Sequence, residues 1–84
     1  MKLTFSSQSW DDYLYWQQTD KKIVKRINEL IKDIQRKPFE GKGKPEPLKH
    51  NLSGFWSRRI TEEHRLVYAI SEDAILVAAC RYHY

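Results

Sequence analysis

Glu46 is a candidate for acid–base chemistry because proline restrains the backbone on both sides of it. Pro45 and Pro47 flank it in the sequence, and three lysines lie nearby: Lys42, Lys44 and Lys49. A rigidly placed carboxylate beside cations suits removal of a proton next to a bound phosphate. The alternative is a solvated loop carboxylate, and the local sequence leaves both interpretations open.

Three arginines could bind such a phosphate: Arg58, Arg59 and Arg65. Side chains alternate across a strand, so Arg58 and Arg59 must face opposite sides of a sheet and the three cannot all serve one site. We expect at least one of them to point outward, solvated or paired with Glu62 or Glu63. An arginine that projects into a groove can donate two hydrogen bonds to phosphate oxygens.

The C-terminus, Arg81-Tyr82-His83-Tyr84, is unusual for a chain end because a β-rich run continues to the last residue. One interpretation is an edge strand that buries aromatic surface. The other is a site, in which His83 exchanges a proton near neutral pH and a tyrosine stacks on a base or holds a phosphate.

The histidines do not have the spacing of a metal site. His50, His64 and His83 recur at no regular interval, and Cys80 is the only cysteine. We therefore expect no zinc site and no cofactor. Cys80 cannot form an intramolecular disulfide, which indicates a reducing compartment, and we expect it to be a small buried residue on a strand.

The N-terminal third predicts a short strand followed by two helices. Lys2 to Phe5 alternates as a strand does. Ser9, three residues before Asp12, resembles a helix N-cap. We expect Trp10, Tyr13 and Leu14 to form the core-facing side of the first helix, in preference to a stacking platform.

A second helix is predicted after the cap Thr19-Asp20, ending by Lys37 because Pro38 disfavours a helical residue before it. Its apolar residues recur with helical period: Ile23, Val24, Ile27, Leu30, Ile31 and Ile34.

The rest of the chain predicts an ordered loop and a sheet. All three prolines and two of the three glycines fall in residues 38–47. Residues 48–52 could form a brief extended segment. FWSRRIT, HRLVYAI and AILVAACRYHY are separated by short polar turns, which predicts two hairpins. The order of elements predicts an α+β fold, with an antiparallel sheet packed on the long helix in a single domain over residues 1–84.

The composition indicates a globular protein whose positive charge is concentrated in one part of the chain. The 84 residues are 40% hydrophobic and 31% charged, which excludes collagen-like and disordered classes. No run is long enough to span a bilayer, and the N-terminus lacks a signal-peptide core, so we expect a cytoplasmic protein that contacts no membrane. The net charge is +4, but residues 21–65 alone carry thirteen basic and six acidic groups, a net of +7. This concentration favours a polyanionic partner, although lysine-rich helices also serve solubility.

Four segments, in this order, carry a resemblance: SWDDYLYW, INELIKD, PFEGKGKPEPLKHNLSGFWSRRITEEHRLVY and AACRYHY. Together they resemble the YoeB toxin family, within the RelE/ParE superfamily, over essentially the whole chain. Phe5 is a departure, since members often carry Trp there. The resemblance implies a toxin that cleaves messenger RNA in the ribosomal A site and is neutralised by a YefM-type antitoxin. It also implies a homodimer or a toxin–antitoxin complex, with operator DNA contacted only through the antitoxin.

Residue by residue, the resemblance assigns roles to the candidates. Glu46 resembles the family's general base, His83 its general acid, and Arg65 the arginine that offsets charge on the phosphate. Tyr84 matches a tyrosine that orients the substrate. Lys49 and Arg59 match residues that contact the RNA backbone, and Lys44 joins them as a basic neighbour of Glu46.

These roles would suffice for cleavage without a metal. The RNA 2′-hydroxyl attacks the adjacent phosphate once a base removes its proton, and an acid protonates the departing 5′-oxygen. DNA lacks this hydroxyl and is excluded as a substrate. Two alternatives remain: a ParE-like inhibitor of a partner protein, and a general RNA-binding domain that cuts no strand.

Overall fold

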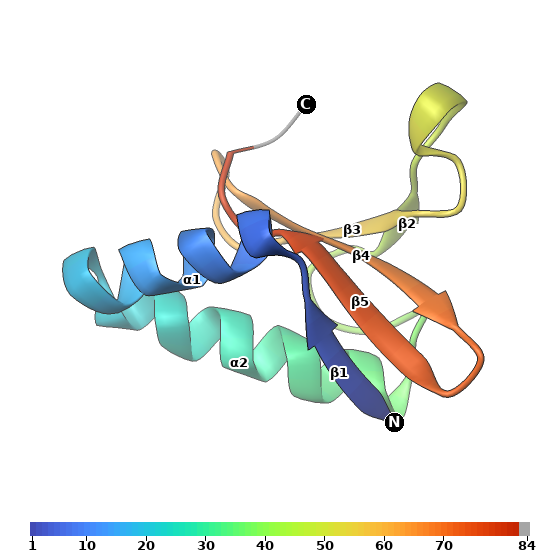
Figure 1. The fold of residues 1–84 in the computed structure, drawn as a ribbon, viewed down its shortest axis with the longest axis horizontal. Coiled ribbons are helices and arrows are strands. Elements are labelled where there is room, and N and C mark those ends of the chain that lie inside the picture. Colours follow the sequence, from blue (N-terminus) through green and yellow to red (C-terminus); the bar gives the residue numbers. More distant parts are fainter. Residues whose placement is uncertain (83–84) are drawn as a thin grey trace.

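The structure is a computed structural model that describes residues 1–82. Helices α1 (Ser7–Thr19) and α2 (Lys21–Arg36) lie side by side against a five-stranded sheet (Figure 1). The strands run across the sheet in the order β1 (Lys2–Phe5), β5 (Ala74–Ala79), β4 (Arg65–Ser71), β3 (Trp56–Arg59) and β2 (Glu46–Pro47). The predicted α+β fold is confirmed.

Strand β1 makes the sheet mixed. It pairs in parallel with β5, from Lys2 opposite Ala74 to Phe5 opposite Val77, whereas the other neighbouring strands are antiparallel. Both predicted hairpins, β3–β4 and β4–β5, are present. Among the described residues, no helix is both long and apolar enough to cross a membrane.

Helix α2 forms as the sequence predicts. Asp20 caps it by accepting hydrogen bonds from the N–H groups of Lys22 and Ile23, and the helix ends at Arg36, just before Lys37 and Pro38. Its apolar side packs against the sheet. The buried residues that cluster in the core are Trp16, Ile27, Leu30, Ile31, Ile34, Ile60, Leu66, Tyr68, Ile75, Val77 and Cys80.

Helix α1 corrects two predictions. Its N-cap is Ser6, whose hydroxyl accepts the N–H of Ser9, so Ser9 lies inside the helix. The predicted core face is also wrong for two of its three residues, because Trp10 is 48% exposed and Leu14 is 36% exposed, whereas Tyr13 is partly buried against the core.

The buried side of α1 is instead largely polar and faces the end of β5. Ser9 donates to the carbonyl of Val77, Trp16 donates to the carbonyl of Cys80, and Asp12 accepts the N–H of Cys80. Buried backbone groups must be paired. The helix therefore turns toward the sheet the side chains that can pair these groups.

The structure corrects two predicted extended segments, the final strand and residues 48–52. The final strand ends at Ala79, and β5 lies between β1 and β4, so it is an inner strand and not an edge. Residues 48–52 contain a single 3₁₀ turn, η1 (His50–Leu52), in place of a strand. His50 has a φ of 59°, in the left-handed region, which breaks an extended conformation.

Candidate active site

Glu46 and Arg65 form the centre of the candidate site. Glu46 lies on β2 and Arg65 begins β4, with β3 between the two strands. Their side chains meet as an ion pair, with Oε1 of Glu46 3.3 Å from Nη1 of Arg65. The Glu46 side chain is 60% exposed and that of Arg65 20%, so the carboxylate is open to a ligand while the guanidinium is partly enclosed.

Arg59 lies directly opposite Arg65 in the β3–β4 register. Like charges in this position repel, and an anion bound between them would relieve the repulsion. Arg59 is exposed, and its N–H donates to the carbonyl of Gly43 at 2.7 Å. With Glu46, the two arginines carry a net charge of +1, which matches the single negative charge of one phosphodiester group.

Lys44 and Lys49 flank β2 on either side. Both are exposed, and Lys44 has a φ of 52°. Lys49 precedes η1, and its carbonyl accepts the N–H of Leu52. The two lysines thus border the Glu46 carboxylate along the chain, where they can add positive charge to an extended anionic ligand.

Arg58 has a different role from its neighbour. The predicted alternation is confirmed: Arg58 is 0% exposed, on the face opposite Arg59. It is paired neither with Glu62 nor with Glu63. Its guanidinium donates to a carboxylate, a phenol and three loop carbonyls: Asp33, Tyr68, Lys37, Glu40 and Lys42.

These bonds fix the segment that leads to Glu46, which we call the Arg58 loop (residues 37–43). Gly43 adopts a φ of 81°, and a Cβ there would lie 3.1 Å from Cβ of Arg58, so only glycine fits easily. The N–H of Lys42 and Arg58 hydrogen-bond to Asp33 and hold the pKa of its carboxyl below the usual value. Burial raises the pKa of Tyr68, whose hydroxyl donates to the carbonyl of Pro38.

The tail (residues 80–82) approaches the same site from β5. The N–H of Arg65 donates to the carbonyl of Tyr82 at 3.0 Å. The N–H of Tyr82 donates to Nδ1 of His64 at 2.7 Å. His83 and Tyr84, the predicted acid and orienting residue, lie outside the described residues. The structure therefore brings together Glu46, Arg59, Arg65 and the end of the tail.

Two contacts of the tail were not predicted from the sequence. His64 accepts from Tyr82, and the guanidinium of Arg81 lies over the ring of Tyr15, 3.6 Å from its centroid. Tyr82 is 18 residues from His64, so no local pattern links the two. The sequence offered one signal for these contacts: the basic Arg81 and the aromatic Tyr82 are adjacent near the C-terminus.

Cys80 is buried, as predicted, but it follows the end of β5 and does not lie on a strand. Burial and the Asp12 carboxylate raise the pKa of its thiol to about 12, so the reactive thiolate is absent near neutral pH. Among residues 1–82, no three His, Cys, Asp or Glu side chains come close enough to form a metal site.

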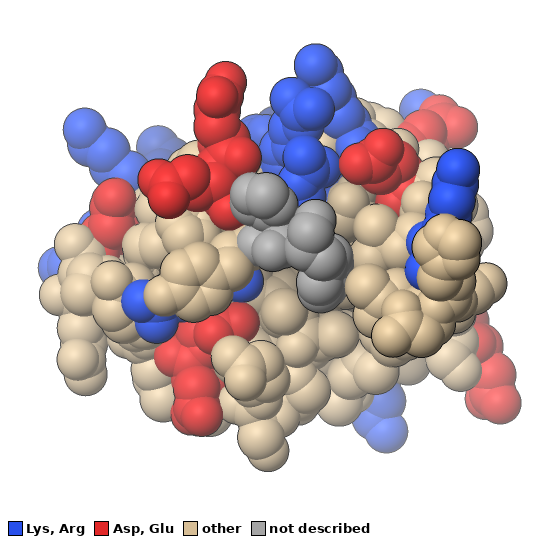
Figure 2. All heavy atoms as spheres, turned by 90° about the horizontal axis from the view of Figure 1, so that it is seen from above, with Lys and Arg blue, Asp and Glu red and all other residues tan. Residues whose placement is uncertain are grey.

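The face that carries the tail has mixed charge. A group of lysine and arginine side chains stands at the upper edge of the view, with acidic side chains on both sides of it (Figure 2). On this face the basic side chains therefore do not form one uniform basic surface.

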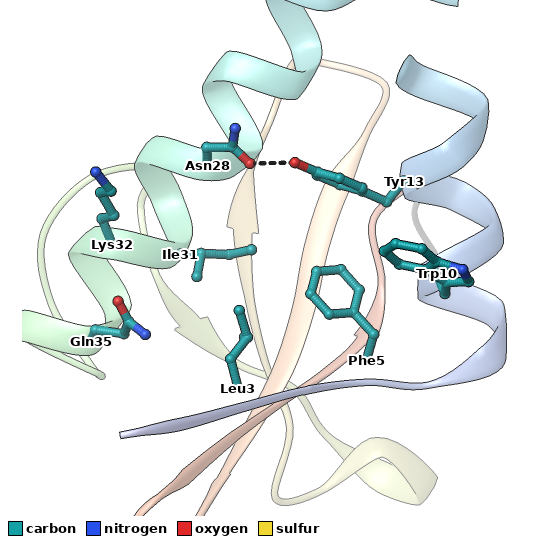
Figure 3. Close-up of a pocket in the computed structure, with 8 residues that line it drawn as sticks. All are labelled: Leu3, Phe5, Trp10, Tyr13, Asn28, Ile31, Lys32 and Gln35. Carbon is teal, nitrogen blue, oxygen red and sulfur yellow. Dashed lines mark hydrogen bonds between the residues drawn. The ribbon is translucent and has the colours of Figure 1, made fainter. Parts of the chain in front are cut away.

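A hollow of about 400 Å³ lies away from these residues, between α1, α2 and β1 (Figure 3). Phe5, Trp10 and Tyr13 form one wall, and Tyr13 donates a hydrogen bond to Asn28 across it. Leu3 and Ile31 form its floor. This groove is mostly apolar, with Asn28, Lys32 and Gln35 along α2, and its lining among the described residues lacks the carboxylate–arginine pairing of the candidate active site.

Comparison with known proteins agrees with the fold. Residues 5–84 match the family of YoeB-like toxins of bacterial type II toxin–antitoxin systems. The chain is 81% identical to Toxin YoeB of Escherichia coli (strain K12), over 100% of both chains.

Two solved structures from Staphylococcus aureus are similar as well. A YoeB dimer superposes with a TM-score of 0.94 at 56% identity, covering 100% of this chain and 98% of that one. A YoeB–YefM complex superposes with a TM-score of 0.93 at 55% identity, with the same coverage. The chain therefore belongs to the YoeB-like toxin family of bacterial type II toxin–antitoxin systems.

Proposed function

We propose that this toxin is a ribosome-dependent endoribonuclease that cleaves messenger RNA in the A site by metal-independent acid–base chemistry. The observation that carries the proposal is the Glu46–Arg65 pair, 3.3 Å apart, with Arg59 opposite Arg65. A carboxylate beside two guanidiniums supplies both a proton acceptor and charge for a phosphate.

In this mechanism Glu46 takes the proton of the 2′-hydroxyl, and the resulting oxygen attacks the adjacent phosphorus. Arg65 offsets the negative charge that builds on the phosphate oxygens. His83 gives a proton to the departing 5′-oxygen, and Tyr84 orients the substrate. The products are a 2′,3′-cyclic phosphate and a 5′-hydroxyl, so no water and no metal-bound nucleophile is consumed in the cut.

Lys44, Lys49 and Arg59 bind the RNA backbone in this proposal. All three are exposed around the Glu46 carboxylate. They would hold the chain on either side of the scissile bond, while Glu46 and Arg65 act on the bond itself.

The protein partners follow from its relatives. We propose that a YefM-type antitoxin neutralises the toxin in the cytoplasm, and that the free toxin forms a homodimer. A YoeB–YefM complex and a YoeB dimer are known for similar proteins from Staphylococcus aureus. Operator DNA would be contacted through the antitoxin.

The test is a cleavage assay on one messenger RNA, with and without translating ribosomes, in excess chelator. We expect cuts within the reading frame only when ribosomes are present, and we expect them to survive chelation. Mapping the new ends should give a cyclic phosphate and a 5′-hydroxyl.

Two other results would favour the alternatives. Salt-sensitive RNA binding without any cut would indicate a general RNA-binding domain. Neither binding nor cutting would favour an inhibitor of a partner protein. Loss of cleavage in chelator, with ribosomes verified intact, would overturn the metal-free mechanism.

A further inference from the structure

The tail makes a sharp turn where it reaches the candidate active site. Tyr82 has a φ of 63°, a left-handed conformation that a tyrosine rarely adopts. Its N–H and its carbonyl are each paired, with Nδ1 of His64 at 2.7 Å and with the N–H of Arg65 at 3.0 Å. Such a conformation persists when the surrounding structure holds it, and it is common at functional sites.

His64 is itself held firmly. Its N–H donates to the hydroxyl of Thr61 at 3.1 Å, and its carbonyl accepts the N–H of Ile60 at 2.9 Å. Its ring packs edge-on against Trp16, with ring centroids 4.8 Å apart. Trp16 is 6% exposed and is fixed by the carbonyl of Cys80, so the imidazole stands on a rigid support.

The direction of the His64–Tyr82 hydrogen bond defines the state of the ring. A backbone N–H can only donate, so Nδ1 must accept and carries no proton. In this arrangement the proton of the neutral ring is on Nε2. His64 therefore acts as a fixed hydrogen-bond acceptor for the tail. Packing of its ring against Trp16 would not by itself require this hydrogen bond.

The mechanism above does not use His64, but the residue beside Tyr82 in the sequence is His83, its proposed acid. We propose that His64 is a positioning residue of the nuclease site: by accepting the N–H of Tyr82, it fixes the turn from which His83 continues. This inference rests on the proposed function. It assigns His64 an effect on the chemical step and none on the grip on RNA.

Two substitutions separate the acceptor from the packing. His64→Phe keeps an aromatic ring against Trp16 but has no acceptor. His64→Asn loses the ring but places an amide oxygen near the position of Nδ1, where it can accept the N–H of Tyr82. Glu63→Gln, an exposed neighbour in the same turn, is the control.

We expect His64→Phe to lower kcat by about 10- to 100-fold, with KM little changed, because the acid is misplaced while the RNA-binding residues are intact. His64→Asn should recover most of kcat, and Glu63→Gln should match the parent. The assay uses the full chain with translating ribosomes, and unfolding curves are recorded for each variant.

Hydrogen exchange at the Tyr82 amide gives a readout that does not depend on cleavage. Protection is expected in the parent and in His64→Asn, and its loss is expected in His64→Phe. If this pattern appears but the parent cuts no RNA, the positioning contact stands and the proposed nuclease activity is wrong.

Three results would overturn the positioning role. They are parental cleavage by His64→Phe, a loss in His64→Asn as large as in His64→Phe, or equal exchange at the Tyr82 amide in all variants of a chain that cuts RNA.

Discussion

The two segments that meet at the candidate active site are held in different ways. The Arg58 loop is held by the fully buried guanidinium of Arg58, which pairs with Asp33 and hydrogen-bonds to several loop carbonyls. The tail is held by hydrogen bonds to His64 and from the N–H of Arg65, and by the stacking of Arg81 on Tyr15. The first anchor is charged and enclosed, whereas the second lies near the solvent.

This difference predicts different costs of disruption. Removing one partner of a buried charge network leaves the other groups unpaired away from water, which is expensive. Removing a contact near the surface lets water take its place. The side of the site that carries the proposed base should therefore be part of the folding unit, and the side that leads to the proposed acid should open with little loss of stability.

The largest effect is expected for Arg58→Met. The substitution leaves Asp33 with only the N–H of Lys42 as a donor and takes the guanidinium away from the carbonyls of Lys37 and Glu40, so the free energy of unfolding should fall by about 3–5 kcal/mol. Urea denaturation measures it. Arg59→Met, at the exposed neighbouring position, should change it by less than about 0.5 kcal/mol. Equal losses in the two variants would mean that burial of the guanidinium does not matter.

A smaller effect, with a pH signature, is expected for Asp33→Asn. Hydrogen bonds from Lys42 and Arg58 lower the pKa of Asp33 below its ordinary value of 3.8. The stability it contributes is therefore complete above that value and is lost as the pH falls through the lower folded value. At neutral pH the free energy of unfolding of the parent should exceed that of Asp33→Asn by about 1.5–3 kcal/mol.

The difference between the parent and Asp33→Asn should narrow on acidification below 3.8. Urea denaturation of both chains over a series of pH values measures it. A gap that stays constant through this range would show that the charge of Asp33 is not what anchors the loop.

The contrast between the anchors also explains what could be read from the sequence. Helix α2 was predictable because its signals are local: its apolar residues recur at helical spacing, and the residues that start and stop it adjoin its own ends. The ordered loop over residues 38–47, which includes most of the Arg58 loop, was predictable from its three prolines. The identity of its anchor was not, because Asp33 is 25 residues from Arg58 in the chain and only the folded sheet brings them together.

The polar face of α1 was missed for the same reason. Asp12 and Ser9 are buried because they pair the backbone at Cys80 and Val77, 68 residues away. Periodicity places apolar residues in the core but carries no information about distant backbone groups that need partners.

The candidate site divides in a similar way. Glu46 stood out because two prolines flank it, which is a local feature. Alternation separated Arg58 from Arg59 but could not select the partner of Glu46. Arg65 was selected by the family resemblance, and the strand order that sets it beside Glu46 is a property of the fold.

A modest effect is expected on the tail side for Arg81→Gln. The change removes a cation that lies 3.6 Å from the ring centroid of Tyr15 and 4.7 Å from that of Tyr82. Exposed cation–π contacts contribute about 0.5–1 kcal/mol, so the free energy of unfolding should fall by no more than that. Arg81→Lys, which keeps the charge, should lose less. A loss as large as that of Arg58→Met would place the tail in the folding unit and remove the contrast.

The smallest effect on folding, and a large one on function, is expected for Glu46→Gln. Its side chain is 60% exposed, and its ion pair with Arg65 contributes at most about 1 kcal/mol. The amide keeps the size and can accept a hydrogen bond, but it cannot take the proton of the 2′-hydroxyl. Cleavage on the ribosome should therefore fall by about 10²–10⁴-fold, while ribosome binding and the unfolding curve stay close to those of the parent.

Glu40→Gln is the control for Glu46→Gln, because Glu40 is also an exposed carboxylate in an ion pair, with Lys37. It should cut RNA as the parent does. Parental cleavage by Glu46→Gln would show that Glu46 is not the base, and a loss shared by Glu40→Gln would trace the effect to surface charge.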